Sequence, residues 1–386
     1  MSSLSLYLHI PFCSHRCSYC DFNTYTSLGH LQTAYAHALA AEIAQAAAGE
    51  RRPVHTIFFG GGTPSLMTPA EMGIIFEALH DNFEIAPDAE ISMECNPITI
   101  SAEYLQAMRM LGVNRLSLGV QSVIANELRL LDRQHDFQTV VNAIDIVRAA
   151  GFDNFNIDLI YGVPGQTLAS WRQSIEAVLA LDPTHLSLYC LTIEPGTPMQ
   201  RWLRNGTMSA PDGDLAADQF ELAVELMGAN GYEHYEISNW AKPNRQCEHN
   251  LTYWRNNDYL GLGAGAHGYA NGVRYHIVKQ PRRYIHSLTE SSAESLHYPL
   301  TGAVADHSRL SAEEKIGDTV ITQLRLLQEG LDCIQFEAQF GVSPNDHFGP
   351  ALGQLIEWEL VQKHGRYLQL TDQGQFVSNQ VFSRLI

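Results

Sequence analysis

Short runs rich in β-branched and aromatic residues alternate with longer amphipathic stretches over the first half of this 386-residue chain. The short runs indicate buried β-strands, and the longer stretches repeat their apolar positions with the period of an α-helix. Six such units in series predict an α/β fold whose parallel sheet curves into a partial (β/α)6 barrel, short of a closed one. The predicted strands are 4–9, 55–59, 90–94, 115–119, 154–160 and 185–190, and the predicted helices are 31–48, 69–81, 102–111, 136–150 and 168–181.

After about residue 300 the pattern changes to helices with short strands. A two-stranded hairpin around His364 and Gly365 follows these helices, and a final helix begins at Thr371. This order is typical of a winged-helix-like module. The chain is therefore expected to contain a barrel at 1–200, a connecting region at 201–300 and a mainly helical C-terminal domain at 301–386.

Composition narrows the class of protein. With 45% hydrophobic and 17% charged residues, the chain can bury a large core. No apolar run reaches ~18 residues, so no transmembrane segment is expected, and the absence of a secretory segment at the N-terminus favours a cytoplasmic protein. A net charge of −18 argues against a nucleic acid partner. The C-terminal domain, with eleven Asp and Glu against six Lys and Arg, is expected to pack or to dock a partner instead.

Three of the seven cysteines, Cys13, Cys17 and Cys20, lie in one short loop. Iron-sulfur cubanes normally take four protein thiolates, so three cysteines predict a [4Fe-4S] cluster with one iron open to another ligand. A zinc site completed by His15 fits less well, because structural zinc sites prefer two paired motifs. A disulfide framework fits poorly with an odd number of cysteines and no secretory segment.

Other chemistry-bearing residues lie at or near the ends of the predicted strands: a glycine run at 60–62 and Gln121 follow their strands, Glu94 ends its strand, and Asp158 lies late in its strand. Ligand sites of α/β barrels gather at the carboxyl ends of the strands, so these features should converge on one mouth with the cysteines. Each has a simpler interpretation. The glycines could form a tight turn, the carboxylates could meet solvent, and Gln121 and Arg133 could lie on the surface.

The cysteine spacing, with the aromatic Tyr19 before Cys20, is that of the radical S-adenosylmethionine (SAM) family. Nearly the whole chain resembles its oxygen-independent coproporphyrinogen III oxidase branch, through YLHIPFC from Tyr7, GGGTPS from Gly60, SLGVQ from Ser117 and NIDLIYGVPGQT from Asn156. The resemblance implies that the cysteines hold the cluster and that SAM chelates its open iron. It implies SAM contacts for Tyr7, Gly61, Glu94, Gln121, Arg133 and Asp158, and, at positions where the oxidase contacts a second SAM, for Tyr19, Gly62 and Thr63.

Two features depart from the oxidase. Phe22 stands where the oxidase has a further cysteine, and the chain begins six residues before Tyr7, without the oxidase's N-terminal extension. Both features resemble the heme chaperones of the same branch. So does a His-Asn-x-x-Tyr-Trp motif formed by His249, Asn250, Tyr253 and Trp254.

The His249 motif has a physical interpretation of its own. A neutral imidazole is a common axial ligand of heme iron, and Asn250, Tyr253 and Trp254 could supply hydrogen bonds and porphyrin packing. Alternatively, His249 caps a loop and Trp254 fills the core. With the resemblance, heme contact is favoured, and His249 ranks before the Cys247 thiolate as the ligand.

A glycine-rich run at 261–268 contains a formal Gly-x-Gly-x-x-Gly. A dinucleotide fingerprint should follow the first strand of a βαβ unit, which this run does not. We expect a turn near the site.

The sequence thus predicts a heme chaperone that binds a [4Fe-4S] cluster, SAM and heme and delivers heme to respiratory acceptor proteins. A homodimer and peripheral membrane association through a partner are both compatible with this prediction. The main alternative is an enzyme, oxygen-independent coproporphyrinogen III dehydrogenase, which converts two propionates to vinyls by radical decarboxylation. A third is a radical SAM enzyme with another substrate, in which His249 only packs.

Overall fold

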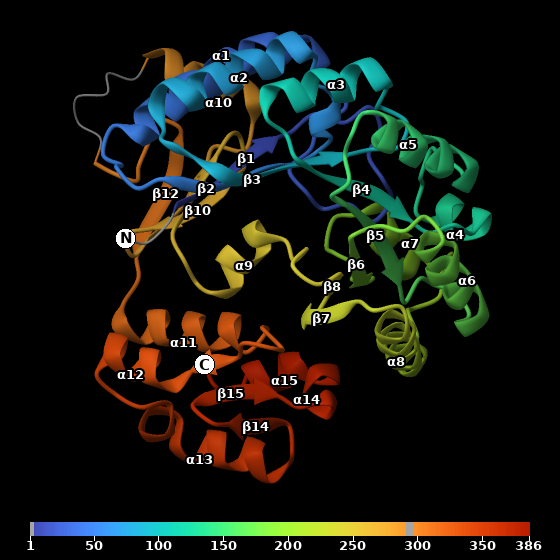
Figure 1. Ribbon diagram of the computed structural model, residues 1–386, viewed down its shortest axis with the longest axis vertical. Helices are drawn as coiled ribbons and strands as arrows, with labels where there is room; N and C mark the ends of the chain where they lie inside the picture. The colour runs from blue at the N-terminus through green and yellow to red at the C-terminus, as the bar shows by residue number, and fades with distance from the viewer. Residues whose placement is uncertain (1–3, 291–296) are drawn as a thin grey trace.

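The computed structural model describes residues 4–290 and 297–386, so 1–3 of the predicted barrel and 291–296 of the predicted connecting region lie outside it (Figure 1). Six parallel strands pair in the order of the sequence, with helices on their outer face, which confirms the partial barrel. The strands are β1 (Leu4–Ile10), β2 (Val54–Gly61), β3 (Ile85–Cys95), β4 (Arg115–Gln121), β5 (Phe155–Tyr161) and β6 (His185–Cys190). The helices are α1 (Gln32–Ala47), α2 (Pro69–Asn82), α3 (Ala102–Leu111), α4 (Ala125–Leu130), α5 (Phe137–Ala149) and α6 (Leu168–Leu179), with 3-10 turns η1 (Gly29–Leu31) and η2 (Pro64–Leu66).

The region after β6 extends the same sheet to twelve strands in the order β12-β11-β10-β9-β1-β2-β3-β4-β5-β6-β8-β7. β9 pairs parallel with β1, and β8 pairs antiparallel with β6. Phe220, Trp240 and Tyr275 belong to the same hydrophobic core as the barrel, and a domain boundary at residue 200 stays a prediction. The added strands are β7 (Glu233–Glu236), β8 (Asn239–Ala241), β9 (Tyr259–Leu262), β10 (His267–Ala270), β11 (Val273–Ile277) and β12 (Val304–Arg309). The helices of this region are α7 (Pro198–Arg204), α8 (Gly213–Ala229), α9 (Glu248–Trp254) and α10 (Pro281–Glu290).

The glycine-rich run forms the turn between β9 and β10. Gly263 and Gly265 have φ angles of +94° and +90°, and a Cβ at Gly263 would lie 2.5 Å from the carbonyl oxygen of His9. Glycine is therefore required where this turn crosses β1. No helix follows the turn, because β10 begins at His267, so the run lacks the helix N-terminus on which a dinucleotide fingerprint depends.

The C-terminal domain has its own core, built around Val320, Phe336, Leu355 and Val381. Its three-stranded sheet has the order β13-β15-β14, and Gly365 turns the β14–β15 hairpin with a φ of +59°. The mainly helical, winged-helix-like arrangement predicted from the sequence is confirmed. Its elements are α11 (Ala312–Gln323), β13 (Leu331–Asp332), α12 (Cys333–Phe340), α13 (Pro344–Glu357), β14 (Val361–His364), β15 (Tyr367–Leu370), α14 (Asp372–Phe376) and α15 (Ser378–Phe382).

Arg325 joins the C-terminal domain to the barrel. Its guanidinium carbon lies 4.4 Å from the centre of the Trp254 ring on α9, and its Nη2 lies 3.9 Å from Oε2 of Glu236, a carboxylate with no solvent exposure. The Leu327 N–H also donates to the carbonyl of Tyr235 at 3.0 Å. The contact therefore ties α9 and β7 to the segment after α11.

We expect Arg325→Ala to lower the free energy of unfolding by about 3 kcal/mol, because it leaves Glu236 buried without its cation. Urea unfolding of both proteins measures the difference. As a control, Arg172→Ala removes an exposed pair with Glu176 on α6 and should cost less than about 1 kcal/mol. Equal losses of unfolding free energy in the two variants would show that Arg325 contributes no more than an exposed ion pair.

Candidate functional site

The barrel lumen is lined largely by polar side chains, whereas closed α/β barrels fill theirs with branched apolar residues. Successive side chains of a strand point to opposite faces, so β4 sends Arg115, Ser117 and Gln121 inward while Leu116 and Leu118 are buried under the helices. The neighbouring strands behave alike. The inward residues include Ser5 and Tyr7 from β1, Thr56 and Phe58 from β2, Ser92 and Glu94 from β3, Asn156 and Asp158 from β5, and His185, Ser187 and Tyr189 from β6.

The three cysteines of the loop after β1 line one cavity of ≈ 140 Å³ at the barrel mouth. All three are free thiols. Thr63 Oγ1 lies 3.5 Å from the sulfur of Cys13, and Arg133 Nη1 lies 3.4 Å from that of Cys17. Such donors stabilise charge on cluster sulfurs. Burial raises the pKa of Cys20 to about 11, so binding iron must displace its proton.

The donor set fits a cubane cluster better than zinc. His15, the fourth ligand of the zinc alternative, instead pairs with Asp132 at 3.0 Å. Within residues 4–290 and 297–386, no group of three or more His, Cys, Asp or Glu side chains is spaced to hold one metal ion. Each thiolate of a cubane holds a different iron, so an iron-sulfur cluster does not require such spacing.

The glycine run after β2 packs against the cysteine loop. Gly62 and Thr63 donate their N–H groups to the carbonyls of Ile10 and Phe12, both at 2.8 Å. A Cβ at Gly62 would lie 2.7 Å from each of these oxygens. Gly61, with a φ of +106°, donates its N–H to Glu94 Oε2 at 3.0 Å. The run is therefore a tight turn that also lines the cysteine cavity.

Glu94 and Asp158 are half-buried acids that line both cavities of the lumen rather than the outer surface. Burial and the neighbouring Asp158 raise the pKa of Glu94 to about 8. Burial also raises the pKa of Asp158 to about 6, and hydrogen bonds limit this shift; Asn156 Nδ2 donates to Asp158 Oδ1 at 2.6 Å. In the described chain, the Gly61 N–H is the one hydrogen-bond donor to Glu94. Its carboxyl group can therefore accept from a ligand.

Gln121 and Arg133 also belong to the site rather than to the surface. Gln121 has a φ of +73°, uncommon for a residue with a Cβ, and it lines the cavity. Arg133 donates to the carbonyl of Gly119 as well as contacting Cys17. Eight of the nine residues for which SAM contacts were predicted line the cysteine cavity; Tyr7 lines the neighbouring cavity instead.

A second cavity of ≈ 460 Å³ adjoins the first through shared residues that include Cys20, Phe22 and Gln121. Its far wall is α9, which carries the His249 motif across the lumen. Cys247, His249, Asn250 and Tyr253 all line this cavity. Trp254 does not: its ring packs against Arg325 at the domain contact, so the expected porphyrin packing by Trp254 is not what the structure shows.

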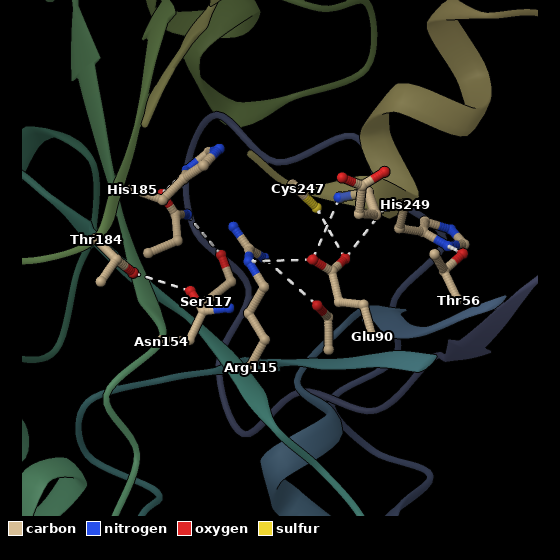
Figure 2. Close-up of polar contacts among 12 residues, drawn as sticks. Thr56, Glu90, Arg115, Ser117, Asn154, Thr184, His185, Cys247 and His249 are labelled. Atoms are coloured by element: carbon tan, nitrogen blue, oxygen red, sulfur yellow. Dashed lines mark hydrogen bonds and ion pairs between the residues drawn. The ribbon is translucent and has the colours of Figure 1, made fainter. Parts of the chain in front are cut away.

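Both ring nitrogens of His249 are hydrogen-bonded. Nδ1 lies 2.8 Å from Thr56 Oγ1, and Nε2 lies 2.8 Å from the Tyr253 hydroxyl (Figure 2 shows the Thr56 contact). The ring also stacks on Phe58 at 5.2 Å between centroids. Burial lowers the pKa of His249 to about 3, with a smaller contribution from Arg115. The imidazole is therefore neutral and fixed in orientation, and it is not a loop cap.

Arg115 and Glu90 are the site residues that the sequence analysis missed. Glu90 contacts the start of α9, and Arg115, the first residue of β4, lies beside it (Figure 2). The sequence did contain a signal for them: both are charged residues within strands that were predicted to be buried, and charged side chains are rarely buried without a partner. Periodicity alone did not assign them to the inner face.

Comparisons with known proteins agree with this geometry. The radical SAM superfamily model matches residues 7–178, and the HemN C-terminal domain model matches residues 310–377. The solved structure of coproporphyrinogen III oxidase (HemN) from Escherichia coli, a radical SAM enzyme, superposes with a TM-score of 0.84 at 27% identity, covering 100% of this chain and 90% of that one. The fold and the cysteine cavity thus define a radical SAM protein. Membership implies a [4Fe-4S] cluster and SAM.

Relatives extend over the full length. The heme chaperone HemW of Mycobacterium tuberculosis is 37% identical over 99% of this chain and 94% of its own. The HemW proteins of Bacillus subtilis and Escherichia coli are each 35% identical, over 99% and 97% of this chain and 99% and 96% of their own. The chain belongs to the HemW family. Among the helices the structure describes, none is long and apolar enough to cross a membrane.

Proposed function

We propose that this protein is a heme chaperone that binds heme in the second cavity, beside a [4Fe-4S] cluster and SAM, and transfers it to respiratory hemoproteins. The observation that carries the proposal is the ≈ 460 Å³ cavity, which α9 lines with Cys247, His249, Asn250 and Tyr253 next to the cysteine loop. Cavities of about 300–1,000 Å³ hold cofactor-sized ligands. The names of the HemW relatives support the same function.

The walls of the second cavity suit a flat apolar ring. Tyr7, Phe58, Tyr189 and Tyr253 supply aromatic surface on several sides, and aromatic side chains pack well against planar ligands. Phe22, a residue that is 62% exposed, lines both cavities. A flat ligand bound in the second cavity beside Phe22 would therefore face the cysteine cavity.

His249 is the proposed ligand of the heme iron. Its imidazole is neutral, which is the form that coordinates metals. Thr56 would keep holding Nδ1 and thereby fix the ring, while the Tyr253 hydroxyl, now bonded to Nε2, would turn away. Two other donors compete for this role, the Cys247 thiol and the Tyr253 hydroxyl itself.

Cluster and SAM, when bound, supply one-electron chemistry. The chain's own residues position them. Thr63 and Arg133 would hold the cysteine sulfurs, and the Glu94 carboxyl group, held by the Gly61 N–H, offers oxygen atoms that can accept from the SAM amino group.

An anaerobic heme titration of the reconstituted protein tests the proposal. We expect stoichiometric binding with a Soret band, and we expect His249→Ala to remove most of that band while the cluster absorbance remains. Tyr253→Phe should keep or raise the affinity, because it frees Nε2. Cys247→Ala should leave the band unchanged.

These variants also separate the competing ligands. If the Soret band is lost in Tyr253→Phe and kept in His249→Ala, Tyr253 is the iron ligand. If it is lost in Cys247→Ala and kept in His249→Ala, Cys247 is the ligand. Transfer is then measured by mixing the purified heme-loaded protein with an apo-cytochrome. No specific heme binding by the unaltered protein would contradict the chaperone proposal.

The structural match to coproporphyrinogen III oxidase, with a TM-score of 0.84, supports a second candidate function. An oxidase would convert coproporphyrinogen III propionates to vinyls under anaerobic reduction with SAM. Phe22, which stands in place of the oxidase's additional cysteine, argues against this candidate. Vinyl products from the purified protein would restore it.

A further inference from the structure

Arg115 is a fully enclosed cation that the proposed chemistry does not use. It is the first residue of β4, its side chain is only 2% exposed, and it lines the second cavity. Buried charges normally have a partner that offsets the loss of hydration. The contacts of Arg115 must therefore account for its charge.

The nearest carboxylate does not fully pair with Arg115. Glu90 Oε2 lies 3.9 Å from Arg115 Nε, beyond hydrogen-bond range (Figure 2). Both Glu90 oxygens instead serve the start of α9: Oε2 accepts from the Glu248 N–H at 3.2 Å, and Oε1 accepts from the His249 N–H at 3.2 Å and lies 3.5 Å from the Cys247 sulfur. Glu90 thus balances charge without satisfying the guanidinium.

The hydrogen-bonding capacity of Arg115 is largely unused. Across the part of the chain that the structure describes, its one hydrogen bond runs from Nη1 to Ser92 Oγ at 3.5 Å, and its buried Nε has no acceptor. Asp158, the other acid nearby, is hydrogen-bonded to Asn156 and Ser117. A guanidinium has five donors in a planar fork that matches a carboxylate. The lumen therefore holds unused hydrogen-bond donors that an anion could accept from.

We propose that Arg115 anchors a carboxylate of the ligand in the second cavity, so that the ligand is a porphyrin with free propionate groups. This inference rests on the proposed function, and it adds how the ligand is oriented: a propionate meets Arg115 at the amino end of β4, and the ring lies along the aromatic walls. A paired, desolvated guanidinium discriminates strongly between a carboxylate and an uncharged ester.

The test uses metal-free protoporphyrin IX and its dimethyl ester, which share the ring but differ in charge and bind without an iron ligand. Fluorescence titration of the reconstituted protein should show the diacid binding ~10- to 100-fold more tightly than the ester. Arg115→Gln should reduce diacid affinity to the level of the ester and leave ester affinity unchanged. Arg115→Lys should keep part of the preference, and Arg172→Gln on α6 should keep all of it.

Several outcomes overturn the proposal. Equal affinity of the two porphyrins for the unaltered protein would do so without any variant, which matters because Arg115→Gln leaves Glu90 buried and could impair folding. An equal loss for both porphyrins in Arg115→Gln would show a purely structural role.

Failure of the chaperone proposal has a different signature. In that case the diacid preference and its dependence on Arg115 persist, while added heme gives no His249-dependent Soret band. Binding of neither porphyrin would overturn both proposals.

Discussion

Replacing any one of Cys13, Cys17 and Cys20 with alanine is expected to remove nearly all iron from the reconstituted protein, from about four atoms per chain. The reason is the number of ligands. A cubane held by three thiolates has no spare ligand, and the three cysteines share one cavity and one short loop. Iron and sulfide analysis after anaerobic reconstitution measures the loss.

Two other cysteines serve as controls. Cys333 lies in the C-terminal domain, and Cys333→Ala should keep a full complement of iron. Cys95 is the sharper comparison, because it lines the cysteine cavity at the end of β3 yet is only 4% exposed, and burial raises its pKa. Cys95→Ala should also keep its iron. Loss of the cluster in Cys95→Ala would identify a fourth thiolate and contradict an iron left open for SAM.

The barrel was predictable because its signals are local. The strands β1 to β6 and most of the helices between them follow the hydrophobic pattern closely, and β6 has the predicted bounds 185–190. β3 begins at Ile85 rather than at residue 90, because Pro87 and Asp88 are exposed and interrupt the apolar run. Ile85 pairs with Val54 of β2 and the next pair is Thr56 with Glu90, so the error arises at a register shift that the hydrophobic pattern does not reveal.

The twelve-stranded extension was not predictable in the same way. β9 pairs with β1 although Tyr259 and Ser5 are far apart in the sequence. On its other side β9 lies against β10, and this close approach requires glycine: a Cβ at Gly261 would lie 1.8 Å from the His267 carbonyl oxygen. The sequence analysis correctly expected a turn in this run, but periodicity contains no information on which strand the turn brings alongside.

Convergence at the barrel mouth was predictable from strand ends, and the depth of the lumen was not. Gly61, Glu94 and Gln121 lie at or near the carboxyl ends of three successive strands and Asp158 at the middle of the next, and all four do line one cavity with the cysteines. The assignment of His249 to heme, by contrast, depended on the family resemblance of its motif, and its buried position between Thr56 and Tyr253 depends on α9 crossing the lumen. The motif therefore combines two roles, since Trp254 points to Arg325 and links the same helix to the C-terminal domain.

Glu94→Gln is expected to stabilise the protein without cluster and SAM while weakening SAM binding by at least about tenfold. Burial and Asp158 raise the folded-state pKa of Glu94 to about 8, above an unfolded value near 4.5. The folded state then binds the proton more tightly than the unfolded state, so stability falls as the pH rises from about 4.5 to about 8. At pH 7.5 this cost amounts to at most about 4 kcal/mol, and glutamine does not incur it.

Urea unfolding between pH 4 and 8.5, with and without SAM, measures both effects. The stability of Glu94→Gln should exceed that of the unaltered protein most at pH 7.5 to 8.5 and equal it near pH 4, and added SAM should stabilise only the unaltered protein. Glu225→Gln, at an exposed carboxylate on α8, should reproduce the unaltered protein at every pH. If the stability difference between the two proteins did not change with pH, Glu94 would be ionised in the folded state without a raised pKa. SAM binding would then not act by relieving the cost of burying this acid.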